Sequence, residues 1–195
     1  MNRAFGRQLD FNDVYVHVTS PEQVFLLNQE GRIVAMSSYN HKEFGGVPSL
    51  VVEGIAVAPE MQGKGVFKAM TEKAREGSYE NFICLRTQNP HMYRALEKYC
   101  YSIFPGKNLD DRINKDLKEL QQEFAKYLDC AMNEKGIAEG YYGGLFYGKR
   151  PEHRRVGPLF DELGINLDKG DALLVTGARS PYMSSEDYDF AMGLI

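Results

Sequence analysis

Apolar runs separated by turns that contain glycine or proline make up the first third of the chain. Residues 23–27 (QVFLL) and 32–38 (RIVAMSS) flank a connection that ends in glycine, a pattern that predicts a β-hairpin. The turn-forming connection 41–48 then leads into 50–57 (LVVEGIAV), a third apolar run. We therefore expect three consecutive antiparallel strands, and we expect the earlier run 14–18 (VYVHV) to add an edge strand.

The periodicity of the apolar positions changes after the third strand. Residues 59–65 are rich in turn-forming residues, and the segment that follows places apolar side chains at helical spacing. A short apolar run at 82–86 (FICLR) predicts a further strand, and Pro90 favours the start of a second helix. The apolar stripes of the two helices comprise Val66, Ala69, Met70 and Ala74 in the first, and Met92, Ala95, Leu96 and Tyr99 in the second.

The longest helical pattern lies in the second half of the chain. Apolar residues there recur at steps of three and four and predict a helix over residues 109–135. A later apolar run predicts a strand at 172–176. We divide the chain into a core, residues 1–106, and a C-terminal extension, residues 107–195, that packs on the same domain.

Composition limits the classes of function. The chain has 195 residues, of which 43% are hydrophobic, enough for the core of one domain. A net charge of -4 does not favour nucleic acid, and no apolar stretch is long enough to span a membrane. The unpaired spacing of Cys84, Cys100 and Cys130 favours reduced thiols and a cytoplasmic location. The histidines lack the spacing of metal ligands, so no metal is expected.

The segment 51–70 carries the strongest chemical signal. An apolar strand ends before Pro59, and residues 62–65 (QGKG) then lead into a helix. Glycines let consecutive backbone N–H groups point at one spot, and the first turn of a helix adds unpaired donors and partial positive charge. This junction suits a diphosphate, although the chain has neither the P-loop pattern nor the Gly-x-Gly-x-x-Gly dinucleotide pattern.

The glycine loop resembles the Gln/Arg-x-x-Gly-x-Gly/Ala signature of the GNAT superfamily of N-acetyltransferases, here as residues 62–67 (QGKGVF). The preceding residues 55–59 (IAVAP) resemble the family's approach from strand to loop. Residues 89–90 (NP) and 97–101 (EKYCY) resemble its asparagine-started helix and its closing segment. The resemblance covers residues 23–105 in the family's order of strand, strand, strand, helix, strand, helix.

This resemblance implies an α/β fold of the GNAT type: a mixed, mostly antiparallel twisted sheet flanked by helices, with a C-terminal helical and strand extension. It implies that the strands at 51–57 and 82–86 splay apart and receive the pantetheine arm of acetyl-CoA, the acyl donor. The first of these strands would bind the pantetheine amides, and the glycine loop would bind the diphosphate. The implied cofactor-binding residues are Ile55, Ala56, Val57, Gln62, Gly63, Lys64, Gly65, Val66, Phe67 and Asn89.

Glu53 is the candidate general base. An alkyl ammonium with a pKa near ~10 must lose a proton before its nitrogen can attack a thioester. Glu53 is the only ionisable side chain in the strand 50–57, and a carboxylate on a half-buried strand is costly without a purpose or a partner. Members of the resembled family often use a glutamate in this strand. The alternative is that Glu53 faces solvent or pairs with a lysine across the sheet.

Tyr93 is the candidate general acid. Many members of the resembled family carry, at the position of Leu96, a tyrosine that reprotonates the departing CoA thiolate. Tyr93 stands one turn earlier, beside the apolar stripe of its helix, where its ring could border the cleft with a free hydroxyl. The alternative is a surface tyrosine. Asn89, directly before Pro90, can both cap the helix and meet a pantetheine carbonyl.

No nucleophile in the sequence is paired with an activating base, so we expect the amine to attack the thioester directly. Cys84 lies between apolar neighbours, and such surroundings raise the pKa of a thiol and leave it inert. We assign the aromatic run 141–147 to the core or to a dimer contact rather than to a substrate cage.

These features together predict an N-acetyltransferase that moves an acetyl group from acetyl-CoA to a primary amine of a small molecule or peptide. The alternatives are a GNAT-like module that binds acyl-CoA without turnover, and a fold reused for protein contacts. The apolar stripe of the helix 109–135 is too extensive to remain exposed. We therefore expect that helix to support the acceptor side of the cleft or a homodimer. Neither nucleic acid nor a membrane is an expected partner.

Overall fold

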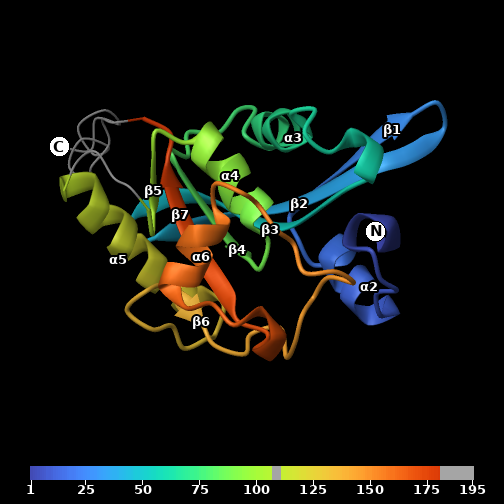
Figure 1. Cartoon of the computed structure of the whole chain (residues 1–195). Coiled ribbons are helices and arrows are strands. Elements are labelled where there is room, and N and C mark those ends of the chain that lie inside the picture. Colours follow the sequence, from blue (N-terminus) through green and yellow to red (C-terminus); the bar gives the residue numbers. More distant parts are fainter. Residues whose placement is uncertain (107–110, 181–195) are drawn as a thin grey trace.

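The chain is organised around a mixed, twisted sheet whose strands follow the order β1-β2-β3-β4-β7-β5, with β6 paired to β7 (Figure 1). The computed structural model describes residues 1–106 and 111–180, and all seven strands lie within them. Among the described strands, only β3 and β4 pair in parallel and the other pairs are antiparallel, which confirms the predicted sheet type. The strands are β1 (Gln23–Gln29), β2 (Arg32–Phe44), β3 (Val47–Val57), β4 (Phe82–Thr87), β5 (Ser102–Phe104), β6 (Ile137–Ala138) and β7 (Ala172–Ala178).

Helices cover both faces of this sheet. Side chains of α3, α4 and α6 share one core cluster with Leu50 and Val52 of β3, whereas those of α5 share a second cluster with Val51. Because successive side chains of a strand point to opposite faces, the two clusters lie on opposite sides of the sheet. The helices are α1 (Asn2–Phe5), α2 (Phe11–Thr19), α3 (Val66–Ala74), α4 (Pro90–Tyr99), α5 (Asp111–Tyr127) and α6 (Gly157–Leu163), with 3-10 turns at Pro59–Met61 and Leu167–Lys169.

Strands β3 and β4 pair over only part of their lengths. Their register runs from Ser49 opposite Phe82 to Val52 opposite Leu85 and then stops. Beyond that point β3 continues along β2, and β4 continues along β7. The two strands therefore splay apart as predicted, and the backbone groups of β3 that face this gap have no partner among the described strands.

The segment expected to form an edge strand at 14–18 is instead part of helix α2. Asp10 precedes the helix in extended conformation, and its carboxylate accepts a hydrogen bond from the N–H of Asn12 at 2.8 Å. This cap satisfies a donor at the helix start and outweighs the preference of Val14 and Val16 for strands. The prediction from β-propensity was wrong here, and the chain has two short helices before β1.

The long helix of the second half is shorter than the predicted 109–135. Helix α5 ends at Tyr127 because Asp129 adopts a left-handed conformation, with φ at 50°. The N–H of Cys130 then bonds to the carbonyl of Ala125 at 3.1 Å, which closes the helix end. Its predicted first two residues lie outside the described residues. The apolar stripe of α5 is buried against the sheet, in the second core cluster.

The remaining differences concern turns and the last strand. The connection expected over 41–48 narrows to Gly45 and Gly46, which turn β2 into β3 with positive φ. The predicted strand 172–176 is confirmed as part of β7, which lies between β4 and β5, so residues from both sides of the predicted boundary at 106 share one sheet. Across residues 1–106 and 111–180, no helix combines the length and apolar character needed to cross a bilayer.

Candidate functional site

Two adjoining cavities open where β3 and β4 part. The gap cavity lies in the gap itself, has an empty volume of about 710 Å³ including the part open to solvent, and reaches from Val52 to Tyr147. The α3 cleft, of about 1320 Å³ measured in the same way, runs from the gap to the start of helix α3. Both cavities are lined by Phe5, Ile55, Met92 and Tyr147, so they meet at these side chains.

The α3 cleft ends at an uncapped helix start. Gly63 and Gly65 both have positive φ, at 75° and 78°, and no side chain caps the first turn of α3. A side chain at either glycine would meet no atom within 4 Å, so these glycines serve the backbone turn rather than packing. The unpaired N–H groups of the first turn and the helix dipole make this end of the cleft an anion site.

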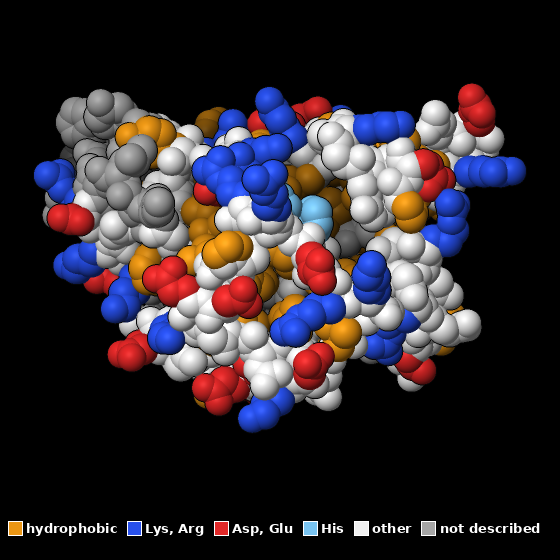
Figure 2. Space-filling model, viewed as in Figure 1, with side chains coloured by type: hydrophobic (Ala, Val, Ile, Leu, Met, Phe, Trp, Pro, Cys, Tyr) orange, Lys and Arg blue, Asp and Glu red, His pale blue; other side chains and the backbone are white. Residues whose placement is uncertain are grey.

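The charged side chains around the α3 cleft are cationic. Lys68, Arg94 and Lys98 line it, and no Asp or Glu is among the described lining residues. Figure 2 shows the hollow from outside, with an apolar floor and with Lys and Arg side chains gathered along one rim. The pKa of His153 is lowered, first by partial burial and then by the neighbouring His91, Arg94 and Lys98. The cleft therefore favours an anionic ligand with several negative charges.

The structure brings most of the predicted cofactor-binding residues to this one cleft. The exception is Lys64, which is exposed and does not line the cleft. The Gln62 amide donates to the carbonyl of Val57 at 3.1 Å and so fastens the loop to the end of β3. Those that line the cleft are Ile55, Ala56, Val57, Gln62, Gly63, Gly65, Val66, Phe67 and Asn89.

Asn89 starts helix α4 as predicted. Its side-chain oxygen accepts a hydrogen bond from the N–H of His91 at 2.9 Å, which identifies it as the N-cap. Its side chain also lines the α3 cleft and forms a hydrogen bond with Tyr147. Phe67, at the first turn of α3, packs edge-on against Tyr99 with ring centroids 5.9 Å apart.

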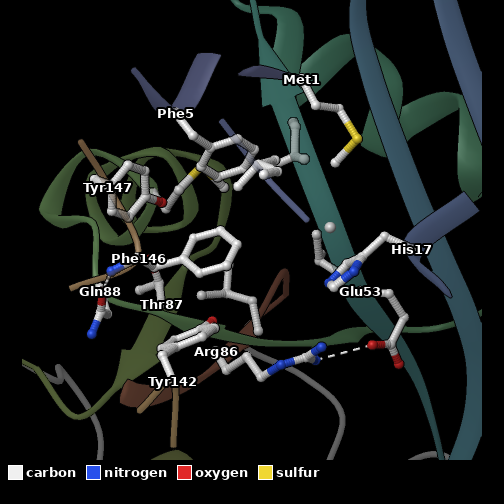
Figure 3. A pocket seen from close by; sticks show the side chains of 16 residues that line it. Met1, Phe5, His17, Glu53, Arg86, Thr87, Gln88, Tyr142, Phe146 and Tyr147 are labelled. Carbon is white, nitrogen blue, oxygen red and sulfur yellow. Dashed lines mark hydrogen bonds and ion pairs between the residues drawn. The ribbon is translucent and has the colours of Figure 1, made fainter. Parts of the chain in front are cut away.

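Glu53 lines the gap cavity and is held by three donors. It is the extra residue of a β-bulge, since Val52 and Gly54 pair with consecutive residues of β2. One carboxylate oxygen accepts from Asn40 at 3.0 Å and from the Tyr127 hydroxyl at 2.8 Å. The other accepts from Arg86 of β4 at 3.0 Å, across the gap (Figure 3). Glu53 therefore neither faces solvent nor pairs with a lysine, the two alternatives expected from the sequence. Its ion-pair partner is an arginine.

The orientation predicted for Tyr93 was wrong. Its side chain is 3% exposed, and its hydroxyl donates to the carbonyl of Pro105 at 2.8 Å. Burial raises the pKa of this phenol well above its usual range. The ring packs edge-on against Phe160 rather than along either cavity. The reason is that the stripe of α4 is wider than its spacing suggested, so Tyr93 belongs to the core with Leu96.

A loop far along the sequence supplies walls that the sequence did not indicate. We call residues 141–148 the aromatic loop. Tyr142, Phe146 and Tyr147 line the gap cavity, although the run was assigned to the core or to a dimer contact. Gln88 at the end of β4 holds the loop there, because its side-chain oxygen accepts from the N–H of Phe146 at 2.8 Å. The only sequence signal was the density of aromatic residues itself.

Tyr147 is the one described ionisable side chain that lines both cavities. Burial raises its pKa to about 12, and its hydrogen bond with Asn89 acts in the opposite direction. The hydroxyl therefore keeps its proton at neutral pH and stands at the junction of the two cavities. Cys84, by contrast, lies fully buried in the second core cluster, where burial raises the pKa of its thiol far above the usual range.

Comparison with known proteins gives one match to a family. The sequence model of the GNAT acetyltransferase family matches residues 3–100. No curated protein is similar in sequence to the chain.

Solved structures that resemble the chain are distant. The ribosomal-protein-S18-alanine N-acetyltransferase of Escherichia coli is 14% identical, with a TM-score of 0.45 over 94% of this chain and 84% of that one. A GNAT acetyltransferase of Elizabethkingia anophelis, solved with acetyl-CoA, is 13% identical, with a TM-score of 0.42 over 87% and 83%. Similarities of this size identify no acceptor.

Proposed function

The chain belongs to the GNAT family of acetyltransferases, and we propose that it transfers the acetyl group of acetyl-CoA to a primary amine. The observation that carries the proposal is the α3 cleft. An uncapped helix start with two left-handed glycines forms one end of the cleft, and cationic side chains line one rim. The other end of the cleft meets the gap between β3 and β4.

The donor fits this arrangement by its chemistry. The diphosphate of acetyl-CoA needs N–H donors and positive charge, which the first turn of α3 and the side chains of Lys68 and Lys98 offer. The pantetheine amides need a strand edge, which β3 offers beyond Val52, where its pairing with β4 has ended. The thioester would then lie where the two cavities meet, beside Ile55 and Tyr147.

The reaction proceeds by direct attack of the amine nitrogen on the thioester carbon. A C–N bond forms, the C–S bond breaks, and the nitrogen loses a proton while the CoA sulfur gains one. No acyl-enzyme is needed, since Cys84 is buried in the core with a raised pKa and lines neither cavity. Catalysis comes mainly from holding the two reactants together in the gap.

Two side chains are assigned to the proton transfers. A carboxylate offers roughly four acceptor positions, so the three donors of Glu53 leave one for the amine or for a water between them. Glu53 is thus proposed as the base. Tyr147, rather than Tyr93, is proposed as the acid that protonates the thiolate, because its hydroxyl is at the junction and keeps its proton.

Substitution of Gly65 tests the donor site. Gly65→Asp adds bulk and negative charge at the helix start, so acetyl-CoA affinity measured by calorimetry should fall about 100-fold or more. Gly31→Asp is the matched control, since Gly31 has the same φ of 78° at the tip of the β1–β2 hairpin and also has open space around it. Wild-type affinity in a folded Gly65→Asp protein would place the donor elsewhere.

Release of free thiol tests turnover. Acetyl-CoA mixed with the protein and a panel of amines should give thiol in proportion to acetylated amine. If the protein binds acetyl-CoA by calorimetry but none of the amines causes thiol release, it is the non-catalytic module instead. A protein that does neither uses the fold for contacts alone.

A further inference from the structure

The gap cavity has a roof made by two segments that are distant in the sequence. The N–H of Gly148 in the aromatic loop donates to the carbonyl of Phe5 in α1 at 2.9 Å. The Arg7 guanidinium, just after α1, donates to the carbonyl of Leu145 at 3.2 Å. The backbones approach so closely that a Cβ at Gly148 would lie 2.0 Å from the carbonyl oxygen of Gly6. Figure 1 shows the loop beside the N-terminal helices.

This roof restricts the shape of an acceptor. A polypeptide that presents a lysine or an amino terminus brings flanking chain with it, and that chain needs an open groove along the cavity. Here α1 and the aromatic loop, which both line the cavity, are joined by the backbone hydrogen bond from Gly148 to Phe5 and by the hydrogen bond from the Arg7 side chain to Leu145. A peptide acceptor would therefore require these two segments to separate. A molecule that fits entirely beneath them would not.

The polar side chains of the cavity wall are largely used by the protein itself. Gln88 donates to the carbonyls of Gly144 and Leu167 and accepts from the N–H of Phe146. The Thr87 hydroxyl accepts from the N–H of Asn89 at 2.8 Å. A polar acceptor body, such as a sugar or a peptide backbone, would leave buried groups without partners here, at a cost for each one.

The Asp, Glu, Lys and Arg side chains that line the described cavity wall form a single ion pair. Glu53 and Arg86 neutralise each other, and their side chains are only 13% and 12% exposed. A second cation on the acceptor, as in a polyamine, would find no unpaired carboxylate among the described residues that line this cavity. The acceptor is therefore best matched when the reacting nitrogen is its only charge.

Aromatic rings supply the contact surface that remains. Phe146 is at their centre: its ring is 5.2 Å from that of Phe5 at 85° and 5.2 Å from that of Tyr142 at 38°. Tyr147 stands 6.0 Å from it at 84°. In Figure 3 these rings gather on the side of the cavity opposite Glu53 and His17. Flat apolar groups pack well against rings arranged edge to face.

Building on the acetyl transfer proposed above, we propose that the acceptor is a small arylalkylamine: a primary amine on a short chain that ends in an aromatic ring. The ring lies against Phe146 and its neighbours beneath the roof. The nitrogen points toward the junction with the α3 cleft, where the thioester lies. Peptide amines, polyamines and amino sugars are excluded by the roof, the balanced charges and the occupied polar groups.

The test compares kcat/KM for thiol release among amines of each class. Phenethylamine should exceed ethylamine, spermidine, glucosamine and a lysine-containing peptide by about 10-fold or more, the advantage expected from burying an aromatic ring. If the peptide, the polyamine or the amino sugar is the best acceptor, the substrate class is wrong although acetyl transfer stands. If acetyl-CoA binds and no amine releases thiol, the proposed function fails and this assignment fails with it.

A substitution in the aromatic wall of the gap cavity gives a second, independent test of where the ring binds. Phe146→Ala should lower the ratio of kcat/KM for phenethylamine to that for ethylamine by about 10-fold, because only the larger amine loses ring contact. Tyr79→Ala is the control, since Tyr79 is 73% exposed and lines neither cavity. Thermal melting checks that both variants fold. An unchanged ratio in a folded Phe146→Ala protein would overturn the proposed position of the ring.

Discussion

Glu53 is fixed in place by its neighbours yet still faces the gap cavity. The bulge turns it out of the regular alternation of β3, and donors from β2, β4 and the end of α5 hold its carboxylate. The ion pair with Arg86 would by itself account for the burial of Glu53, without any role in catalysis. A structural role and a role as general base differ in how activity depends on pH.

Glu53→Gln separates these roles. If the carboxylate is the base, kcat should fall about 100-fold or more at neutral pH, and the loss should shrink at high pH, where the amine loses its proton unaided. A purely structural role lowers activity by a similar factor at every pH. Glu43→Gln, an exposed change on the neighbouring strand β2, is the control. Intact turnover at neutral pH would move the base role to water or to another residue.

Glu80 shows a different use of a buried carboxylate, away from both cavities. Its side chain is 7% exposed and accepts hydrogen bonds from His41 and Ser78. Burial by itself raises the pKa of this group, but the two hydrogen bonds outweigh it, and the pKa lies below the usual value. The native state therefore favours the ionised carboxylate. Glu80 stabilises the fold at every pH at which this carboxyl is also ionised in the unfolded chain.

Glu80→Gln should thus lower the free energy of unfolding at neutral pH. Because the folded pKa is depressed, the stabilisation is present above the unfolded pKa and is lost as pH falls through the folded one. The difference between wild type and variant should narrow as the pH falls below 4.5, the ordinary pKa of a glutamate, as measured by urea unfolding. Glu76→Gln is the control, since that carboxylate is 65% exposed. A constant difference across this range would refute the assignment.

At the scale of elements, local patterns predicted most helices and strands but not where each one ends. The hairpin, α3, β4 and α4 followed directly from apolar spacing and from Pro90. The exceptions depended on single polar residues, since Asp10 capped a helix where valines favoured a strand, and Asp129 ended α5 early. Both contributions come from backbone hydrogen bonding, which apolar periodicity does not measure.

The joint between α1 and the aromatic loop is the element on which acceptor binding depends. Gly148→Ala places a methyl group against the carbonyl of Gly6, so the two segments must separate. We expect kcat/KM for the acceptor to fall about 10-fold to 100-fold, since misplaced binding groups lose orientation. Gly157→Ala is the matched control, because a Cβ there meets nothing within 4 Å. Unchanged kinetics in the Gly148→Ala protein would show that the roof does not shape the site.

At the scale of the whole molecule, the donor half of the site was predictable and the acceptor half was not. The glycine loop and β3 are close in sequence, so their motif indicated the cleft. The gap cavity combines α1, the strands β3 and β4 and the aromatic loop, and no local pattern links Phe5 to Tyr147. The predicted homodimer stays a prediction, to be tested by light scattering.

The position of β7 predicts that residues 1–106 do not fold without the rest of the chain. A fragment of residues 1–106 would leave one edge of β4 unpaired and would leave β5 without its neighbour β7. It would also lose the side chains of α5 from the second core cluster. We expect this fragment to show no cooperative thermal transition by circular dichroism, whereas the full chain shows one. A cooperative transition in the fragment would mark residues 1–106 as a domain that folds alone.

The same strand order sets the timing of folding during synthesis. The ribosome completes β4 at Thr87 but does not reach Ala172, the start of β7, until 85 residues later (172 − 87 = 85). At ~5–20 residues per second, this interval lasts roughly 4–17 s. Throughout it the nascent chain carries an apolar strand with an open edge, so chaperones that shield such edges should affect the yield of this protein more than its final stability.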